Sequence, residues 1–172
     1  EQSGYAQVYT VKEQALPDGN FPTVISPNPE EKEALKMAVS LGTKKEADVV
    51  IGTDPDADRF GFVIRDHDSE WYYLNGNQIM MVLTEFLLEK KQIQNELSPN
   101  CFIASTIVST PLIEKIALAY GIQYKSTLTG FKWIAKLIED FPELDFICGG
   151  EESYGFLIGK SVRDKDAISG SL

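Results

Sequence analysis

The sequence predicts an α/β protein with mixed, mainly parallel sheets and flanking helices. Short runs rich in β-branched residues, typical of buried strands, alternate along the chain with longer stretches whose apolar residues recur at helical spacing. Strands that alternate with helices favour parallel pairing through right-handed crossovers. With 172 residues, the chain is long enough for one large or two small domains with a buried core. We expect two consecutive α/β domains, residues 1–75 and residues 76–172.

The first part contains one helix, one strand and one hairpin. Tyr5–Val11 alternates weakly and is compatible with a helix end or a strand. A helix is expected to begin near Asn28, with Asn28 or a neighbour as its cap, and to end at Gly42. Leu35 and Val39 would share its buried face. The expected strands are residues 48–52, 60–65 and 71–74, the last two paired as a hairpin.

The second part alternates helices with strands. Thr110 followed by Pro111 predicts a helix cap and a first helical residue, and Gly121 is expected to stop that helix. Along the last long helix, Trp133 should turn inward with the apolar residues that follow it. Residues 169–172 begin a further helical pattern. The expected helices are residues 77–91, 112–120 and 131–140, and the expected strands are residues 101–107, 122–125 and 144–148.

Composition and charge exclude several classes of protein. A net charge of −10 argues against general binding to nucleic acid or to an anionic membrane. No apolar run approaches the ~20 residues of a membrane span, and no signal peptide is visible. Cys101 and Cys148 lie in apolar, strand-like runs, so we expect two reduced core thiols in a cytoplasmic protein rather than a disulfide or a metal pair. His67, the only histidine, is expected to be a solvated loop residue.

An acidic loop follows directly after the first expected strand. Asp54, Asp56 and Asp58 alternate within it, just past the carboxyl end of that strand, where ligand sites form in open α/β sheets. Three like charges this close repel one another, and a bound cation relieves that repulsion. Carboxylate oxygens are hard ligands, so Mg²⁺ is the expected ion, with Mn²⁺ and Ca²⁺ as alternatives. Arg59 adds a positive fork suited to phosphate oxygens.

Two other interpretations of this loop concern turns and calcium sites. A solvated acidic turn is common in proteins and stays an alternative. A calcium loop of the EF-hand kind requires Gly at its sixth position and Glu at its twelfth. Here these positions hold Arg59 and Arg65, so the EF-hand is excluded.

Three further loops carry groups that suit a phosphorylated sugar. Glu151 and Ser153, in a glycine-rich loop, can hydrogen-bond adjacent sugar hydroxyls, although a plain glycine-rich turn is the alternative. Lys132 lies in the first turn of a helix, whose positive end disfavours an ammonium; it is a candidate proton carrier or phosphate ligand, or simply a surface lysine. Arg163 and Lys165, in a mixed-charge run, either line a phosphate pocket or form a solvated face.

The order of these loops resembles that of the α-D-phosphohexomutase family, which includes phosphoglucomutases and phosphomannomutases. Residues 53–59 (Thr-Asp-Pro-Asp-Ala-Asp-Arg) look like its metal-binding loop, and residues 148–155 (Cys-Gly-Gly-Glu-Glu-Ser-Tyr-Gly) look like its sugar-recognition loop. Residues 129–132 (Thr-Gly-Phe-Lys) and 163–166 (Arg-Asp-Lys-Asp) match further third-domain motifs, and residues 27–30 (Pro-Asn-Pro-Glu) match its second domain. The resemblance covers nearly the whole chain.

The resemblance implies a reversible 1,6-phosphoryl shift on a hexose phosphate, in which a phosphoserine donates its phosphoryl group and a bisphosphorylated sugar forms. It implies that Asp54, Asp56 and Asp58 hold Mg²⁺, or Mn²⁺ in its place. It further implies that Arg59 contacts the transferred phosphate and that Lys132 carries a proton, both as catalytic residues. Glucose 1,6-bisphosphate would prime the parent enzyme. The implied substrate-binding residues are Thr129, Gly130, Glu151, Ser153, Arg163 and Lys165.

The details of the motifs bear on the substrate. The Glu-Glu-Ser form of the sugar loop is similar to that of glucose or mannose mutases rather than glucosamine ones. Tyr154, Trp133 and Pro55 favour a branch of phosphoglucomutases with phosphopentomutase-like members, so a phosphopentomutase-type parent is an alternative.

Two parts of the family pattern are missing from the sequence. One is the phosphoserine loop of the form Thr-Ala-Ser-His-Asn-Pro, and the other is the fourth domain. Ser26 lies in a superficially similar Ser-Pro-Asn-Pro sequence, but that sequence fits the second-domain motif better. We therefore interpret the chain as a piece of a longer protein, inactive alone. It would comprise an incomplete second domain, residues 1–75, and most of a third domain, residues 76–172.

Two rival hypotheses from other classes use the same acidic loop. A stand-alone module that binds divalent cations or sugar phosphates would show useful affinity without further domains. A different Mg²⁺ phosphotransferase or phosphatase would need its own nucleophile, such as Asp54, and the sequence has no accompanying motif. The partners expected from the resemblance are a sugar phosphate substrate and the remaining domains of the parent enzyme.

Overall fold

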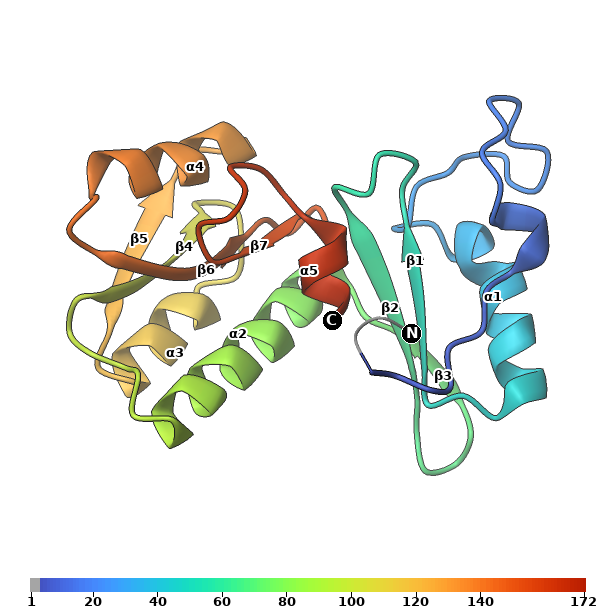
Figure 1. Cartoon of the computed structure of the whole chain (residues 1–172), viewed down its shortest axis with the longest axis horizontal. Coiled ribbons are helices and arrows are strands. Elements are labelled where there is room, and N and C mark those ends of the chain that lie inside the picture. The colour runs from blue at the N-terminus through green and yellow to red at the C-terminus, as the bar shows by residue number, and fades with distance from the viewer. Residues whose placement is uncertain (1–3) are drawn as a thin grey trace.

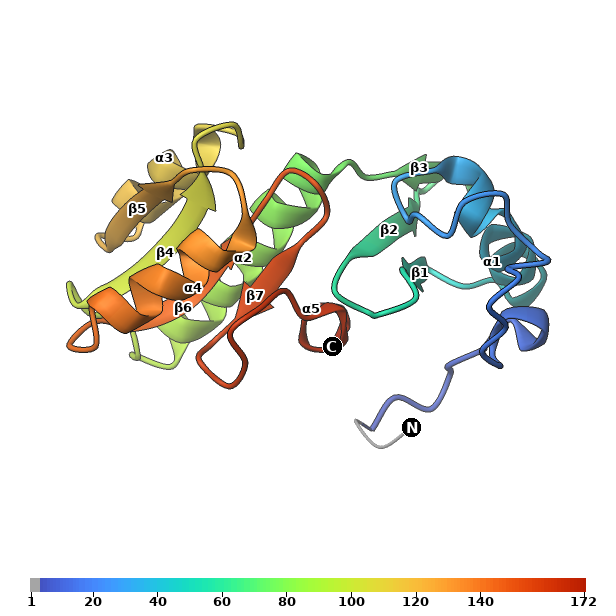
Figure 2. The ribbon, with the colours of Figure 1, turned by 90° about the horizontal axis from the view of Figure 1, so that it is seen from above.

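The structure of the protein, a computed structural model, describes residues 4–172. Two sheets stand side by side, one of three strands and one of four, and α5 (Ala167–Ser171) lies between them (Figures 1 and 2). Both sheets carry helices, so the predicted α/β class is confirmed. The other elements are η1 (Lys12–Gln14), α1 (Lys32–Lys45), β1 (Val49–Thr53), β2 (Phe60–Arg65), β3 (Trp71–Tyr73), α2 (Gly76–Ile93), β4 (Cys101–Thr106), α3 (Leu112–Ala119), β5 (Gln123–Thr127), α4 (Phe131–Asp140), β6 (Asp145–Gly150) and β7 (Phe156–Ile158).

The first sheet has the order β1-β2-β3, and both of its strand pairs are antiparallel. The predicted hairpin of β2 and β3 is confirmed. β1 also pairs with β2, because the acidic loop between them turns the chain back on itself. Leu35 of α1 packs with Val50 and Val63 in a small core on one face of this sheet. The loop therefore projects from the end of a hairpin supported by α1.

Helix α1 differs from the expected helix at both ends. It begins at Lys32 and ends at Lys45, where Glu46 takes a left-handed conformation with a φ of 52°. Gly42, which was expected to stop the helix, lies inside it. A Cβ at Gly42 would approach Cγ2 of Val50 to 2.8 Å, so the glycine lets the helix pack closely on the sheet.

The second sheet has the order β5-β4-β6-β7. β4 runs parallel to β5 and β6, in agreement with the predicted crossovers, whereas β7 is antiparallel to β6. The hydrophobic pattern did not predict β7, which has only three residues. Side chains of β4 alternate between two cores: Ile103 packs with residues of α2 and α3, and Phe102 packs with residues of α4. Helices on both faces thus bury the central strand.

Phe60, at the start of β2, joins the two halves of the molecule. Its side chain is fully buried in the same core as Met80, Cys148 and Phe156, which belong to the second half. Gly170 of α5 lies against the Phe60 ring so closely that a Cβ there would overlap it. The acidic loop, which directly precedes Phe60, is therefore held against the second half of the chain.

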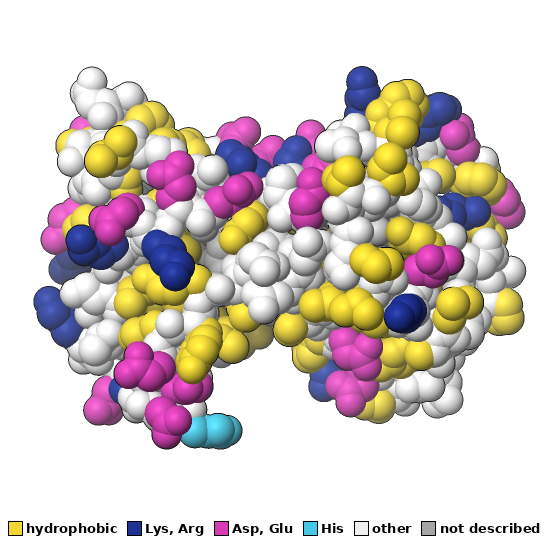
Figure 3. Space-filling view, turned by 180° about the vertical axis from the view of Figure 1, so that it is seen from behind, with side chains coloured by type: hydrophobic (Ala, Val, Ile, Leu, Met, Phe, Trp, Pro, Cys, Tyr) yellow, Lys and Arg dark blue, Asp and Glu magenta, His cyan; other side chains and the backbone are white. Residues whose placement is uncertain are grey.

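The face of the first sheet that carries Phe60 is apolar and exposed farther along its strands. Strand register places Val49, Ile51, Ile64 and Tyr72 on this face, and all four side chains are exposed. Seen from the rear, apolar side chains border the hollow between the two halves (Figure 3). Contacts between the halves are thus concentrated around Phe60, next to the acidic loop.

Two local expectations are wrong. Tyr5–Val11 forms neither a helix nor a strand. Trp133 is 37% exposed instead of turned inward. The buried stripe of α4 runs through Phe131, Ile134 and Ile138, and a residue two positions after Phe131 falls beside this stripe rather than on it.

The helix ends of the second half agree better with the sequence. α3 begins at Leu112 with Pro111 at its N-cap position, one residue later than expected. The Leu112 N–H still donates to the Thr110 hydroxyl over 3.3 Å, so Thr110 supports the start of the helix from the position before the cap. Gly121 follows the helix with a φ of 68°, which favours glycine. At the start of α2, Asn75 and Gln78 form a reciprocal capping box, with each side chain accepting from the other residue's N–H.

The thiols and the histidine have the predicted environments. Cys101 and Cys148 are free and buried. His67 is exposed in the turn between β2 and β3. Within residues 4–172, no helix combines the length and the apolar character that crossing a membrane requires.

Candidate functional site

The acidic loop is organised by its own first aspartate. Oδ1 of Asp54 accepts the backbone N–H groups of Asp58 and Arg59, both over 3.1 Å. The backbone closes the same loop, because the Asp54 N–H donates to the Arg59 carbonyl over 3.2 Å. Ala57 sits at the tip with a φ of 55°. The buried carboxylate of Asp54 thus shapes the loop that presents the other two.

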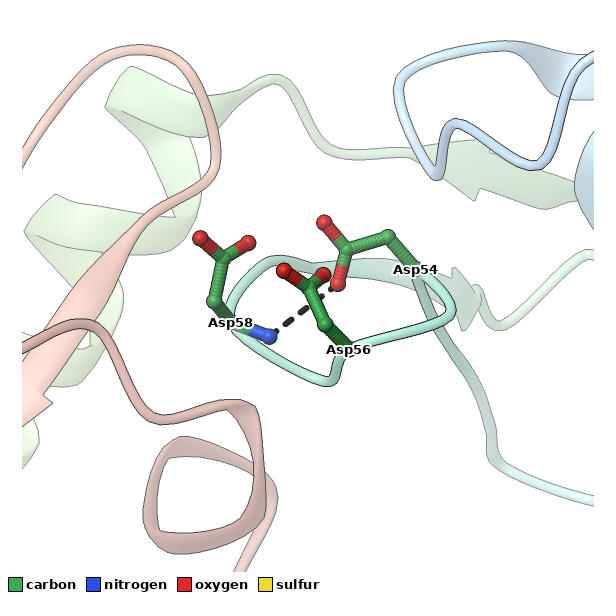
Figure 4. A group of neighbouring side chains, drawn as sticks. All are labelled: Asp54, Asp56 and Asp58. Atoms are coloured by element: carbon green, nitrogen blue, oxygen red, sulfur yellow. Dashed lines mark hydrogen bonds between the residues drawn. The ribbon is translucent and has the colours of Figure 1, made fainter.

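Asp54, Asp56 and Asp58 point to one side of the loop (Figure 4). One oxygen from each carboxylate lies within 4.8 Å of the others. Oxygens that share one Mg²⁺ at about 2.1 Å lie at most about 4.2 Å apart, so small side-chain rotations complete such a set. Exposure increases from the buried Asp54 through the half-buried Asp58 to the exposed Asp56. The donor set fits a hard divalent cation approached from solvent.

Two positive side chains contact this trio. Nε of Arg59 lies 2.9 Å from Oδ2 of Asp54 and 3.7 Å from Oδ1 of Asp58, and its Nη1 lies 3.8 Å from Oε1 of Glu30. Nζ of Lys165 lies 2.8 Å from Oδ2 of Asp58. Arg59 was expected beside the acidic loop, but the sequence placed Lys165 only in a separate motif.

The pKa values of Asp54 and Asp58 shift in opposite directions. Burial disfavours ionisation of Asp54, but hydrogen bonds from the backbone and side chain of Arg59 outweigh it, and the pKa of Asp54 falls below its usual value. Burial, aided by the neighbouring Asp54 carboxylate, raises the pKa of Asp58 despite the hydrogen bond from Lys165. Burial alone would lower the pKa of Lys165, yet its hydrogen bond to Asp58 raises it.

The glycine-rich loop after β6 brings Glu151 to the start of α4. The Glu151 side chain is buried, and its Oε1 accepts the backbone N–H of Gly130 over 2.8 Å. Gly130 precedes α4 with a φ of 114°, a conformation that favours glycine. The structure therefore brings together two of the predicted motifs, the Thr129–Lys132 turn and the Glu-Glu-Ser loop.

The neighbouring Glu152 points to a different element. Its Oε2 accepts hydrogen bonds from the hydroxyls of Thr106 and Ser109, over 3.1 and 3.0 Å, at the end of β4. The two adjacent glutamates thus diverge, as expected for neighbouring residues of a turn. Glu151 faces α4, whereas Glu152 ties the loop to β4.

Backbone contacts join the acidic loop to the glycine-rich loop. Arg59 and Gly155 form an antiparallel bridge, and the Phe60 N–H donates to the Tyr154 carbonyl over 3.3 Å. Gly155 also leaves room for the aliphatic part of Lys165, which a Cβ at this position would overlap. Of the three predicted motifs in the second half of the chain, the glycine-rich loop and the 163–166 run contact the acidic loop directly. The 129–132 turn reaches the acidic loop through the glycine-rich loop.

Other predicted residues lie farther out. Lys132 is exposed, and its ammonium sits 5.3 Å from the centre of the Trp133 ring. Arg163 is exposed and forms no ion pair with any residue in the described range 4–172. Thr129 is exposed and Ser153 half-buried. Lys132 lies in the first turn of α4, whereas Thr129, Ser153 and Arg163 lie outside the helices and strands. None of the four contacts the acidic trio within residues 4–172.

Sequence reasoning missed three neighbours of the site. Glu30 pairs with Arg59, the Phe131 ring lies 5.5 Å from Nζ of Lys165, and Tyr154 supplies the carbonyl that binds Phe60. Burial and the charge of Glu30 raise the pKa of Tyr154. All three residues lie within motifs that the sequence analysis identified, but the sequence did not predict their contacts.

The fold and the site together define an α/β protein with a candidate centre for a divalent cation. Sequence profiles described as "Phosphoglucomutase/phosphomannomutase, alpha/beta/alpha domain II" and "alpha/beta/alpha domain III" match residues 1–67 and 75–172. The chain belongs to the phosphoglucomutase/phosphomannomutase family.

Curated relatives are similar along almost the whole chain. A phosphoglucomutase of Staphylococcus epidermidis is 44% identical over 165 residues, which is 95% of this chain and 30% of the relative. A phosphoglucomutase of Staphylococcus aureus is 41% identical over 166 residues, or 95% of this chain and 29% of the relative. The chain thus spans about a third of the length of these relatives.

Solved structures share the fold at lower sequence identity. A phosphoglucomutase/phosphomannomutase family protein from Burkholderia thailandensis superposes with a TM-score of 0.69 at 19% identity, over 90% of this chain and 31% of that one. The N-acetylphosphoglucosamine mutase of Aspergillus fumigatus, in complex with GlcNAc-6P and magnesium, has a TM-score of 0.54 at 16% identity, over 78% of this chain and 32% of that one.

Proposed function

We propose that this chain is the metal- and sugar-binding part of a phosphoglucomutase or phosphomannomutase that catalyses reversible 1,6-phosphoryl transfer on a hexose phosphate. The observation that carries the proposal is the bridge between Arg59 and Gly155. It joins a carboxylate cluster suited to a cation to a loop suited to sugar hydroxyls. A phosphoryl group bound between them would lie beside both.

In this proposal Asp54, Asp56 and Asp58 hold Mg²⁺, or Mn²⁺ in its place. The bound ion would stabilise negative charge on the phosphoryl group during transfer. Asp54 keeps the loop in shape through its hydrogen bonds, and Asp56 is open to the incoming ion. Arg59, which lies 2.9 Å from Asp54, would contact the transferred phosphate. The magnesium in the Aspergillus fumigatus mutase complex is consistent with this choice of ion.

The sugar would be held by the loops around the trio. The second oxygen of Glu151, together with Ser153, would accept or donate hydrogen bonds to adjacent hydroxyls. Thr129 and Gly130 would line the same pocket, because Gly130 is tied to Glu151. Lys132, Arg163 and Lys165 supply positive charge for phosphate groups, and Lys132 is our candidate proton carrier. A sugar phosphate is therefore the proposed substrate, and glucose 1,6-bisphosphate the proposed primer.

Residues 1–75 and 76–172 would be successive domains, the first incomplete. The boundary is supported by the break between the two matched profiles and by the capping box at Asn75. The phosphoserine and the group that holds the distal phosphate would come from other domains of a longer, cytoplasmic protein. The chain alone is then expected to bind the cation weakly and to show no turnover, because one metal ligand, a phosphoserine oxygen, is missing.

A phosphotransferase with its own aspartate nucleophile is less well supported. Both oxygens of Asp54 accept hydrogen bonds, from two backbone N–H groups and from Arg59. Such contacts lower the nucleophilicity of a carboxylate. Failure to trap a phosphoaspartate on this chain would separate the two hypotheses.

The proposal is tested with a mutase assay primed with glucose 1,6-bisphosphate. The chain alone should give no turnover, whereas a protein extended to the length of its relatives should interconvert glucose 1-phosphate and glucose 6-phosphate. In the extended protein, Asp56→Ala should lower kcat by about a hundredfold or more. The matched control is Asp68→Ala, an exposed aspartate in the turn after β2. Full activity in the Asp56→Ala variant would refute the metal role of the loop.

A further inference from the structure

The Lys165 ammonium forms an ion pair with one member of the acidic trio. Its ammonium lies 2.8 Å from Oδ2 of Asp58 and 3.3 Å from Oδ1 of Asp164. Only 18% of the Lys165 side chain is exposed, against 72% of the Asp164 side chain. The pair with Asp58 is therefore the sheltered one, and it belongs to the site rather than to the solvated surface.

The position of the ammonium is determined by packing along the whole side chain. The aliphatic part of Lys165 runs over the Cα of Gly155, where a Cβ would overlap Cδ. The ammonium then lies 5.5 Å from the centre of the Phe131 ring. Both neighbours come from motifs of the proposed sugar site. Such packing lowers the entropy lost when the ion pair forms.

Without a metal ion, Arg59 and Lys165 supply the positive charge that faces the three carboxylates. Each also pairs with a carboxylate outside the trio, Arg59 with Glu30 and Lys165 with Asp164. A divalent cation bound to the trio would supply positive charge in their place. The ammonium and the ion would also compete for the oxygens of Asp58. Arg59 pairs with both Asp54 and Asp58, whereas Lys165 pairs with Asp58 of the trio. Adding the ion therefore favours departure of the lysine.

We propose that Lys165 is an internal counter-ion that a divalent cation displaces from Asp58, so that metal binding releases the Lys165 ammonium to bind a phosphate group. The inference rests on the proposed metal site. It adds that the two binding events are coupled. Before the metal binds, the Lys165 ammonium pairs with Asp58; after the metal binds, the same ammonium is free to pair with a phosphate group.

The coupling predicts how metal affinity responds to the charge at position 165. Mn²⁺ is titrated by calorimetry into the chain and into the Lys165→Gln, Lys165→Arg and Lys36→Gln variants. Lys165→Gln removes the competitor and should bind Mn²⁺ about tenfold more tightly, which corresponds to about 1.4 kcal/mol. Lys165→Arg keeps the charge, and Lys36→Gln removes a charge from a side chain that is 73% exposed on α1. Both should stay within about twofold of the unaltered chain.

A second measurement reports on the lysine directly. Acetic anhydride labelling followed by mass spectrometry compares the acetylation of Lys165 and Lys36 in the unaltered chain, with and without Mg²⁺. Saturating Mg²⁺ should increase the labelling of Lys165 several-fold and leave that of Lys36 unchanged. This measurement decides the matter if the Lys165→Gln variant proves unfolded by circular dichroism.

The possible outcomes separate this inference from the proposed function. Metal binding that is unchanged or weaker in Lys165→Gln, or Lys165 labelling that ignores Mg²⁺, would overturn the counter-ion role and leave the metal site intact. Absence of Mn²⁺ binding in every variant, at concentrations up to the millimolar range, would overturn the metal site and the counter-ion role together.

Discussion

The backbone of Arg59 pairs with the backbone of Gly155 in an antiparallel bridge. The two residues lie in different halves of the chain, one at the end of the acidic loop and the other at the end of the glycine-rich loop. Gly155 also packs against the aliphatic part of Lys165, and the ammonium of Lys165 pairs with Asp58. One short backbone contact thus holds together the groups proposed for the metal and for the sugar.

Substitution of Gly76 should disturb the glycine-rich loop through direct overlap. A Cβ at Gly76 would collide with the backbone of Glu152 and come within 2.9 Å of the Tyr154 nitrogen. Backbone atoms cannot move aside as a flexible side chain can, so Gly76→Ala should lower the free energy of unfolding by about 2 kcal/mol. Urea denaturation measures the change. The control is Gly19→Ala, because that glycine has open space around it; equal stability of the two variants would contradict the prediction.

Asp54 and Asp56 should differ in what they contribute to stability. Asp54→Asn weakens three hydrogen bonds of a buried carboxylate and should cost about 2 kcal/mol in metal-free buffer at pH 7. Asp56→Asn changes an exposed side chain and should cost less than about 0.5 kcal/mol, although it should abolish binding of Mn²⁺.

The contribution of Asp54 should also depend on pH. Its pKa is lower in the folded protein than the value of 3.8 that applies to the unfolded chain. The stabilisation is therefore complete above pH 3.8 and is lost as the pH falls through the folded pKa. The stability difference between the unaltered chain and Asp54→Asn should shrink as the pH falls below this value. A difference that grows toward acid would mean that the carboxylate is destabilising.

Cys148 should resist thiol reagents in the folded state. It is fully buried, and burial raises the pKa of its thiol to about 12, against a small opposing effect of the hydrogen bond with Thr84. At pH 8 almost none of the thiol is ionised, and the thiolate is the reactive form. Iodoacetamide followed by mass spectrometry should label Cys148 only after unfolding in urea. Rapid labelling of the native protein would show that the core around β6 opens readily.

The capping box at the start of α2 should be worth a measurable amount of stability. Asn75→Ala removes the acceptor for the Gln78 N–H and should cost about 1 kcal/mol. Gln78→Ala removes only the reciprocal bond to the Asn75 N–H, at an exposed position, and should cost less. Thermal unfolding followed by circular dichroism compares the two. Greater loss in Gln78→Ala than in Asn75→Ala would reverse the assignment of the main cap.

Much of the fold was predictable because its signals are local. The spacing of Ile134 and Ile138 predicts the helix around them, and the turn chemistry at Thr110 and Gly121 predicts where α3 begins and ends. The signals failed where neighbours in space decide the outcome. Gly42 looks like a helix stop in the sequence, yet the close approach of Val50 makes it an interior packing residue.

The sequence by itself determined the class of fold and the family, because the spacing of apolar residues and the order of the short motifs are local features of the chain. Only the tertiary structure decided that Lys165 would pair with Asp58 and that Gly155 would pair with Arg59. These partners lie about a hundred residues apart in the sequence. A bridge between two backbones does not depend on the types of the paired residues, so the sequence does not predict it. The buried Phe60 ring, shared between the two halves, is the physical reason that they meet.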